Sequence, residues 1–193
     1  MINSSIPNVS EKEKKNLIKC IKDNYISAGG EFIQKFSKEI CRITKSKYCV
    51  LTSSGSSALH TALLTIGVKK DDLIIVPSFT FIASVSAIKL AGAEPWFFDI
   101  SNKDWSIDTE LLHNELKKNT YFDKKKILRH KKTKQKITAI MPVYTLGQIA
   151  NIKEIKKIAK KYKLKIIADA ACAIGAEQDN KKIGEIGVDI STL

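Results

Sequence analysis

Short, largely apolar runs alternate with amphipathic segments from residue 48 to residue 193 of this chain. The runs are four to six residues long, too short for helices, and they lack the polar alternation of a strand with one wet face. They lie at residues 48–51, 73–76, 95–100, 137–141, 164–168 and 189–193. Strands of this kind are buried on both faces and are typical of parallel sheets. The sequence therefore predicts an α/β fold, a mostly parallel sheet flanked by helices.

Helix signals fill most of the gaps between the predicted strands. The expected helices cover residues 57–66, 79–91, 108–118 and 151–162. Asp108 and Asn151 are suited to cap the last two of these, and Gly92 lies just beyond the end of the second. Upstream, a capping box that begins at Ser10 and an amphipathic stretch after residue 30 predict two more helices.

One domain is the simplest organisation, because the chain has no internal repeat and no low-complexity linker. We expect N-terminal helices over residues 1–46 and an α/β core over residues 47–193. Residues 175–187 are expected to form a β-hairpin, and a lysine-rich insertion at about residues 119–136 is expected to be exposed.

The net charge of +13 is concentrated in two segments. Residues 117–136 contain ten basic side chains and one acidic, and residues 153–165 contain seven and one. Only Arg42 and Arg129 are arginines, so the bidentate groups that read phosphates and bases are almost absent. We therefore expect an exposed loop and a solvated helix face, and no nucleic-acid partner.

Several other classes of protein are also disfavoured. No apolar run approaches the ~18 residues of a membrane-spanning helix, and residues 1–15 lack the apolar core of a signal peptide. We expect a cytoplasmic protein without a membrane partner. The four cysteines form no C-x-x-C pair, which predicts free, buried thiols and no metal site.

Ligands of such sheets bind beyond the carboxyl ends of the strands, where three segments of this chain are predicted to meet. The first is SSGSS at residues 53–57, a turn of small residues that opens a helix. Free backbone N–H groups, hydroxyls and the positive end of the helix dipole suit a phosphate there. The segment matches neither the P-loop nor the dinucleotide-binding glycine pattern, and a simple helix cap is the alternative.

The other two segments offer complementary chemistry. Asp169 follows an apolar strand, and its carboxylate either faces a buried cationic nitrogen or caps the next helix. Phe81 either stacks on a planar ring or belongs to the core. A phosphate cradle, a ring platform and a carboxylate for a ring nitrogen together match pyridoxal 5′-phosphate (PLP), whose pyridine accepts electrons when its nitrogen is protonated.

Seven motifs extend this match over nearly the whole chain, in a consistent order and spacing. They are ISAGG (26–30), SSGSSALH (53–60), VPSFTF (76–81), GAEP (92–95), DI (99–100), MPV (141–143) and ADAA (168–171). On these motifs the sequence resembles the DegT/DnrJ/EryC1/StrS family of PLP-dependent sugar aminotransferases. The resemblance implies a partial large domain of a fold-type I PLP-dependent aminotransferase, roughly the first half of a family member.

The resemblance also implies roles for individual residues. Ser56 and Ser57 would hold the cofactor phosphate, with Gly55 in the same turn. Phe81 would stack on the cofactor ring, and Asp169 would pair with its pyridine nitrogen.

Two departures from the family pattern bear on catalysis. Cys172 stands where relatives have a glutamine, histidine or glutamate that contacts the ring hydroxyl, and a thiol is a poor hydrogen-bond partner. The family's catalytic lysine, in an S-F-x-x-x-K motif, forms the Schiff base and shuttles the proton. We expect that lysine beyond Leu193, so no catalytic residue is assigned within the chain, and the chain alone is expected to be inactive.

The family reaction moves an amino group, usually from glutamate, onto a keto carbon of a nucleotide-linked deoxysugar. The resemblance therefore implies glutamate and a nucleotide-linked keto-sugar as partners in surface-polysaccharide biosynthesis, and a homodimer for the complete enzyme. The alternative function is a non-catalytic domain that binds a nucleotide sugar or a protein partner.

Overall fold

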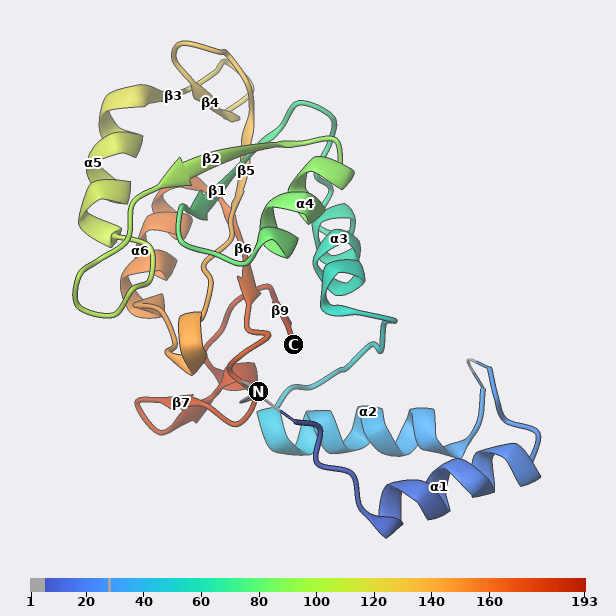
Figure 1. The fold of residues 1–193 in the computed structure, drawn as a ribbon. Coiled ribbons are helices and arrows are strands. Elements are labelled where there is room, and N and C mark those ends of the chain that lie inside the picture. Colours follow the sequence, from blue (N-terminus) through green and yellow to red (C-terminus); the bar gives the residue numbers. More distant parts are fainter. Residues whose placement is uncertain (1–5, 28) are drawn as a thin grey trace.

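A five-stranded sheet forms the centre of the computed structural model, which describes residues 6–27 and 29–193. Its strands are β1 (Leu73–Pro77), β2 (Glu94–Phe98), β5 (Ile137–Ile140), β6 (Lys165–Asp169) and β9 (Ile190–Thr192). They lie in the order β2-β1-β5-β6-β9, and every neighbouring pair is parallel (Figure 1). The predicted α/β fold is confirmed.

Helices cover both faces of the sheet (Figure 1). Helices α3 (Gly55–Thr65) and α4 (Ile82–Leu90) lie on one face, and α5 (Thr109–Asn119) and α6 (Ile152–Tyr162) lie on the other. Strand β1 shows why both faces need a cover, because alternate apolar side chains of a strand point to opposite faces of the sheet. Ile74 and Val76 pack in the core with α3 and α4, whereas Leu73 and Ile75 pack in the core with α5 and α6.

Two short hairpins and two 3₁₀ turns complete the α/β part. They are β3 (Thr120–Phe122) with β4 (Leu128–His130), β7 (Glu177–Gln178) with β8 (Lys181–Lys182), η1 (Thr145–Gly147) and η2 (Ile183–Glu185). The β3–β4 hairpin spans the lysine-rich segment. Leu128 anchors it in the core, while Lys124, Lys125 and Lys126 at its turn are exposed. The second hairpin matches the one predicted within residues 175–187.

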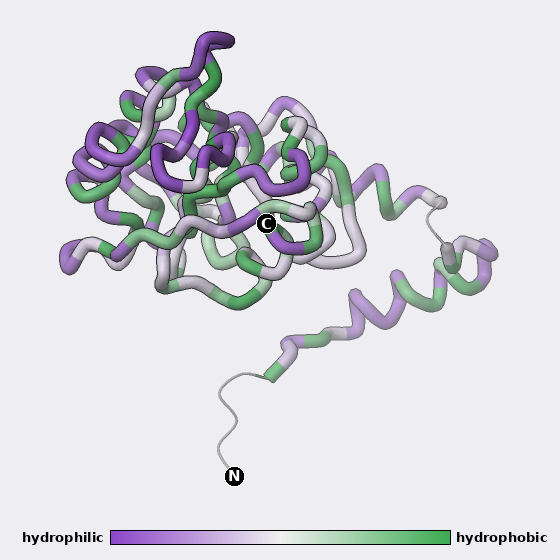
Figure 2. The backbone as a smooth tube through the Cα atoms, turned by 90° about the horizontal axis from the view of Figure 1, so that it is seen from above, coloured by the Kyte–Doolittle hydropathy of each residue, from purple (hydrophilic) through white to green (hydrophobic). Residues whose placement is uncertain are grey.

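Helix α2 (Glu31–Thr44) contacts the α/β body at η2, and α1 (Glu11–Lys22) extends away from that body (Figure 2). The predicted capping box is present, with Ser10 and Glu13 bonded reciprocally. An ion pair between Lys19 and Glu31 joins the two helices. Residues 1–5 and Ala28, which belong to the polar N-terminus and the ISAGG motif respectively, lie outside the described residues.

Two of the sequence predictions are wrong. Residues 48–51 form no strand, and Tyr48 and Val50 are exposed, because this apolar run has no neighbouring strand to pair with among the described residues. The cysteines are free, yet none is buried: three are half-buried and Cys172 is exposed. Within the described residues, no helix has the length and apolar character needed to cross a bilayer.

Candidate active site

Three predicted segments meet at the carboxyl edge of the sheet. Strand β6 ends at Asp169, β1 ends at Pro77 just before α4, and α3 contacts α4, β6 and β9. Helix α3 leads into β1 through a short connection, so its N-terminus lies at the edge where β1 ends (Figure 1). The fold thus gathers parts of the chain that are more than one hundred residues apart.

The N-terminus of α3 provides unused donors. Ser54 caps the helix, because its Oγ accepts from the N–H of Ser57 at 3.2 Å and its carbonyl accepts from Ala58. Ser54 therefore caps α3, and this cap does not use the N–H groups of the two residues that follow it. The N–H groups of Gly55 and Ser56 have no partner within the described chain, as expected for a first helical turn.

Open space adjoins these donors. A Cβ atom added to Gly55 would meet nothing within 4 Å, so the first turn of α3 borders room for a ligand. The hydroxyl of Ser57 lies 3.0 Å from that of Ser54 and 3.2 Å from that of Ser53. The local dipole and these polar groups favour an anion at this position.

Asp169 is buried, with 6% of its surface exposed, and hydrogen bonds fix both its side chain and its backbone. Its Oδ2 accepts from the Ser84 hydroxyl at 2.6 Å, and its Oδ1 accepts from the N–H of Ala171 at 3.3 Å. Its backbone N–H donates to Pro142 and its carbonyl accepts from Tyr144. Residues 170–176 form turns and no helix follows, so the alternative of a helix cap is wrong.

Ser84 is a hydrogen-bond partner of Asp169 that the sequence did not predict. It is fully buried in α4, and its hydroxyl also lies 2.8 Å from that of Thr80. Its N–H bonds to the carbonyl of Phe81, so a single helical turn connects Phe81 with Asp169. In the sequence, Ser84 is a serine among mostly apolar residues of α4. No local pattern there indicates its role.

Phe81 lies at the N-cap of α4 with 77% of its surface exposed, so the core alternative is wrong for this residue. Its neighbour Phe79 instead packs edge-on against Trp105 at 5.5 Å. Cys172 is exposed three residues after Asp169. The exposed Phe81 therefore lies one helical turn from Ser84, the residue that bonds the buried carboxylate.

Tyr144 packs its side chain in the core on the α5 and α6 face of the sheet. Its N–H donates to the carbonyl of Asp169 at 2.8 Å, and its ring is buried with a hydroxyl that has no partner in the described chain. Burial raises the pKa of the Tyr144 phenol well above its usual range. Tyr144 therefore stays neutral and packs as part of the core.

The chain matches one family of known proteins. The model of the DegT/DnrJ/EryC1/StrS aminotransferase family matches residues 7–193. GDP-perosamine synthase of Escherichia coli O157:H7 is 34% identical over 97% of this chain and 46% of the relative. A Campylobacter jejuni UDP-4-amino-4,6-dideoxy-N-acetyl-β-L-altrosamine transaminase is 32% identical over 96% of this chain and 45% of the relative.

A solved structure shows the same fold. A putative sugar aminotransferase from Streptococcus pneumoniae, in its PLP form, superposes with a TM-score of 0.80 at 22% identity, over 98% of this chain and 47% of that one. The chain spans about half the length of the relatives that it matches. The family match and the identities lead to one conclusion: the chain belongs to the DegT/DnrJ/EryC1/StrS aminotransferase family.

Proposed function

We propose that the protein to which these residues belong is a PLP-dependent aminotransferase that aminates a nucleotide-linked keto-sugar. The observation that carries the proposal is the contact of Ser84 with Asp169, which joins a buried carboxylate to the helical turn that presents Phe81. The open N-terminus of α3 lies at the same edge of the sheet. These are the three groups that a phosphorylated, protonated pyridine requires.

The residues at this edge fit PLP chemically. The N–H groups of Gly55 and Ser56, with the hydroxyls of Ser56 and Ser57, suit its phosphate. Phe81 has a free face for its ring. Asp169 is acceptor-only when ionised, and each carboxylate oxygen has lone pairs left beside the bonds that it already accepts, so it suits a pyridinium N–H.

Each residue has a distinct task in the proposed mechanism. When bound, PLP supplies an electron sink for the carbanion formed at the amino-acid carbon. Asp169 holds a proton on the ring nitrogen, and Ser84 keeps the carboxylate oriented. The first turn of α3 anchors the phosphate, and Phe81 fixes the plane of the ring. The catalytic lysine of the family pattern is proposed to come from outside residues 1–193.

The substrate class rests on relatives. The names of two relatives specify a GDP-linked and a UDP-linked amino sugar, and both cover this chain almost completely. We propose a nucleotide-linked keto-deoxysugar as acceptor, glutamate as amino donor, surface-polysaccharide biosynthesis as the process and a homodimer as the active assembly.

Binding of pyridoxamine 5′-phosphate tests the site. This amine form of the cofactor cannot condense with the many lysines of the chain, so calorimetric titration reports only a true site. We expect one molecule bound per chain and at least tenfold weaker binding in Asp169→Asn. Glu110→Gln, which neutralises an exposed carboxylate on α5, is expected to bind like the wild type. No binding by the folded chain, or equal binding by both variants, contradicts the proposal.

A further inference from the structure

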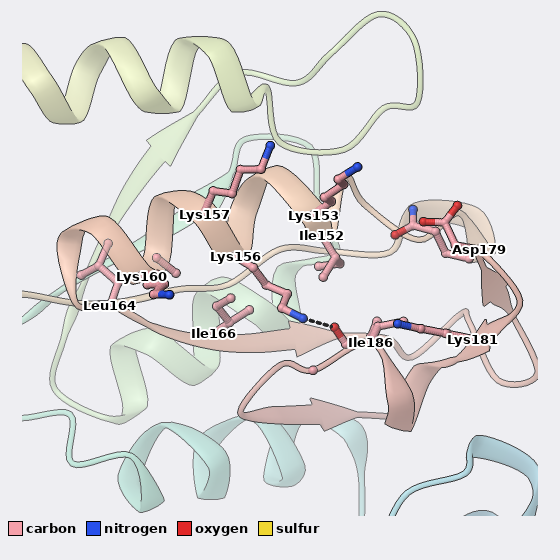
Figure 3. A pocket seen from close by; sticks show the side chains of 13 residues that line it. Ile152, Lys153, Lys156, Lys157, Lys160, Leu164, Ile166, Asp179, Lys181 and Ile186 are labelled. Carbon is pink, nitrogen blue, oxygen red and sulfur yellow. Dashed lines mark hydrogen bonds between the residues drawn. The ribbon is translucent and has the colours of Figure 1, made fainter.

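A cavity lies on the opposite face of the sheet from α3 and α4. It has a volume of about 660 Å³ and opens between α6, β6 and residues 178–187 (Figure 3). None of its lining residues belongs to the candidate active site. Its volume is in the range of small-molecule sites, about 300–1,000 Å³.

The lining of this cavity carries a strong excess of positive charge. Five lysines and a single carboxylate, that of Asp179, are among its lining residues. The lysines are Lys153, Lys156, Lys157 and Lys160 on α6 and Lys181 on β8. The four on α6 recur at the spacing of neighbours on one side of a helix. This concentration creates a local positive potential that a bound anion would relieve.

Most of these charges are uncompensated. Lys157 pairs with Glu154 at 2.6 Å, and the ammonium of Lys156 donates to the carbonyl of Ile186 at 2.9 Å. Within the described residues Lys153, Lys160 and Lys181 have no ion-pair partner. Because a carbonyl does not neutralise the charge of Lys156, four of the five lining lysines have no carboxylate partner in the described part of the chain: Lys153, Lys156, Lys160 and Lys181.

The shape distinguishes the cavity from an ordinary solvated helix face. Ile152, Leu164 and Ile166 are buried and form an apolar wall, and the segment with Ile186 and Gly187 faces them (Figure 3). Lysine stems cover such a wall while their ammonium groups stay at the rim. Gly187 has φ +75°, and a Cβ there would come within 2.7 Å of the Lys156 ammonium. The backbone thus leaves room for that charge.

We propose that this cavity binds a small anion with two or more linked phosphoryl groups. Lysine ammonium groups are compact point charges that bind phosphate without the planar geometry that arginine imposes. Several lysines within one concavity match several charges on one small ligand. The extended backbone of a nucleic acid instead requires a stripe of charge along an open surface. This inference does not depend on the proposed aminotransferase function.

Calorimetric titration with tripolyphosphate at fixed ionic strength tests the inference. The decisive comparison is between two triple variants that each remove three charges. One is Lys153→Gln, Lys156→Gln and Lys160→Gln, and the other is Lys124→Gln, Lys125→Gln and Lys126→Gln at the exposed β3–β4 turn. We expect one bound tripolyphosphate per wild-type chain, affinity at least tenfold weaker in the α6 triple, and a change below twofold in the control.

Further titrations separate the sources of the ligand chemistry. Lys181→Gln, from the opposite wall, is expected to weaken binding severalfold. ATP in place of tripolyphosphate distinguishes a nucleotide site from an inorganic one: equal affinities mean that only the phosphate chain is recognised, and tighter ATP binding means that the apolar wall holds the nucleoside. Three results would overturn the proposal. The first is an equal loss of tripolyphosphate affinity in both triple variants, and the second is no saturable binding. The third is tighter binding of a single-stranded oligonucleotide, weakened equally by both triple variants.

Discussion

The hydroxyl of Ser84 donates a 2.6 Å hydrogen bond to Oδ2 of Asp169, across 85 residues of sequence. Both side chains are buried, and the bond joins α4 to the end of β6. Hydrogen bonds to a charged acceptor in a dry environment are short and strong. The bond therefore fixes the direction of the carboxylate at the edge where Phe81 is exposed.

Removing this donor is expected to affect both stability and binding. Ser84→Ala leaves a buried carboxylate oxygen short of a partner, which costs about 1–3 kcal/mol in the free energy of unfolding. We also expect about tenfold weaker binding of pyridoxamine 5′-phosphate. Urea denaturation and calorimetry measure the two effects. Ser86→Ala, on the exposed side of the same helix, is the matched control. Identical behaviour of the two variants would show that the bond does not position the carboxylate.

A substitution at Gly55 is expected to weaken ligand binding without changing the stability of the fold. Because nothing lies within 4 Å of its missing Cβ, Gly55→Leu is expected to fold with unchanged stability, within about 0.5 kcal/mol. The new side chain fills the space next to the free N–H groups of α3, so affinity for pyridoxamine 5′-phosphate should fall at least tenfold. Retained affinity in this variant would place the phosphate elsewhere.

A structural feature can be predicted from the sequence when the interactions that produce it are local. The parallel sheet was predictable because its central strands are mostly apolar, and β1 is apolar along its whole length. The caps at Asp108 and Asn151 were predictable because each binds N–H groups two or three residues away. Ser84 was not, because a serine inside a helix has no pattern that reveals a carboxylate 85 residues later.

The same reasoning explains the strand that did not form. Residues 48–51 have the composition of a buried strand, but a strand needs a neighbour, and pairing is a property of the whole fold. Burial of Cys172 was likewise expected from its residue type, yet its position on a turn exposes it. For the candidate site, the sequence predicted Phe81, Asp169 and the α3 turn. The structure adds Ser84, whose hydroxyl donates to Asp169 and whose N–H donates to the carbonyl of Phe81.

Asp72 is a structural rather than a functional carboxylate. It is buried, and its Oδ2 accepts from the Thr138 hydroxyl at 2.6 Å and from the Lys136 ammonium at 3.2 Å, which ties the start of β1 to β5. We expect Asp72→Ala to lower the free energy of unfolding by about 3 kcal/mol, because it leaves these donors without their acceptor. Urea denaturation measures this loss. A loss below about 1 kcal/mol would contradict the assigned role.

The contact between α1 and α2 depends on pH. The ammonium groups of Lys19 and Lys35 lower the pKa of Glu31 from 4.5 to about 2. The folded-state pKa is depressed, so the contribution to stability is fully present above pH 4.5 and is lost as the pH falls through about 2. Carbon NMR of the Glu31 carboxyl measures this pKa, and Lys19→Gln should raise it. An unchanged pKa in that variant would argue against the ion pair.

Amide NMR during titration with pyridoxamine 5′-phosphate tests the central claim most directly, because it locates the ligand on the chain. We predict saturation at one equivalent, the largest amide shifts at Gly55 and Ser56, and a shift of the Asp169 carboxyl carbon that Ser84→Ala reduces. Shifts confined to Lys153, Lys156 and Lys160 of α6, with Gly55, Ser56 and Asp169 unmoved, would contradict the claim that this edge of the sheet holds the cofactor.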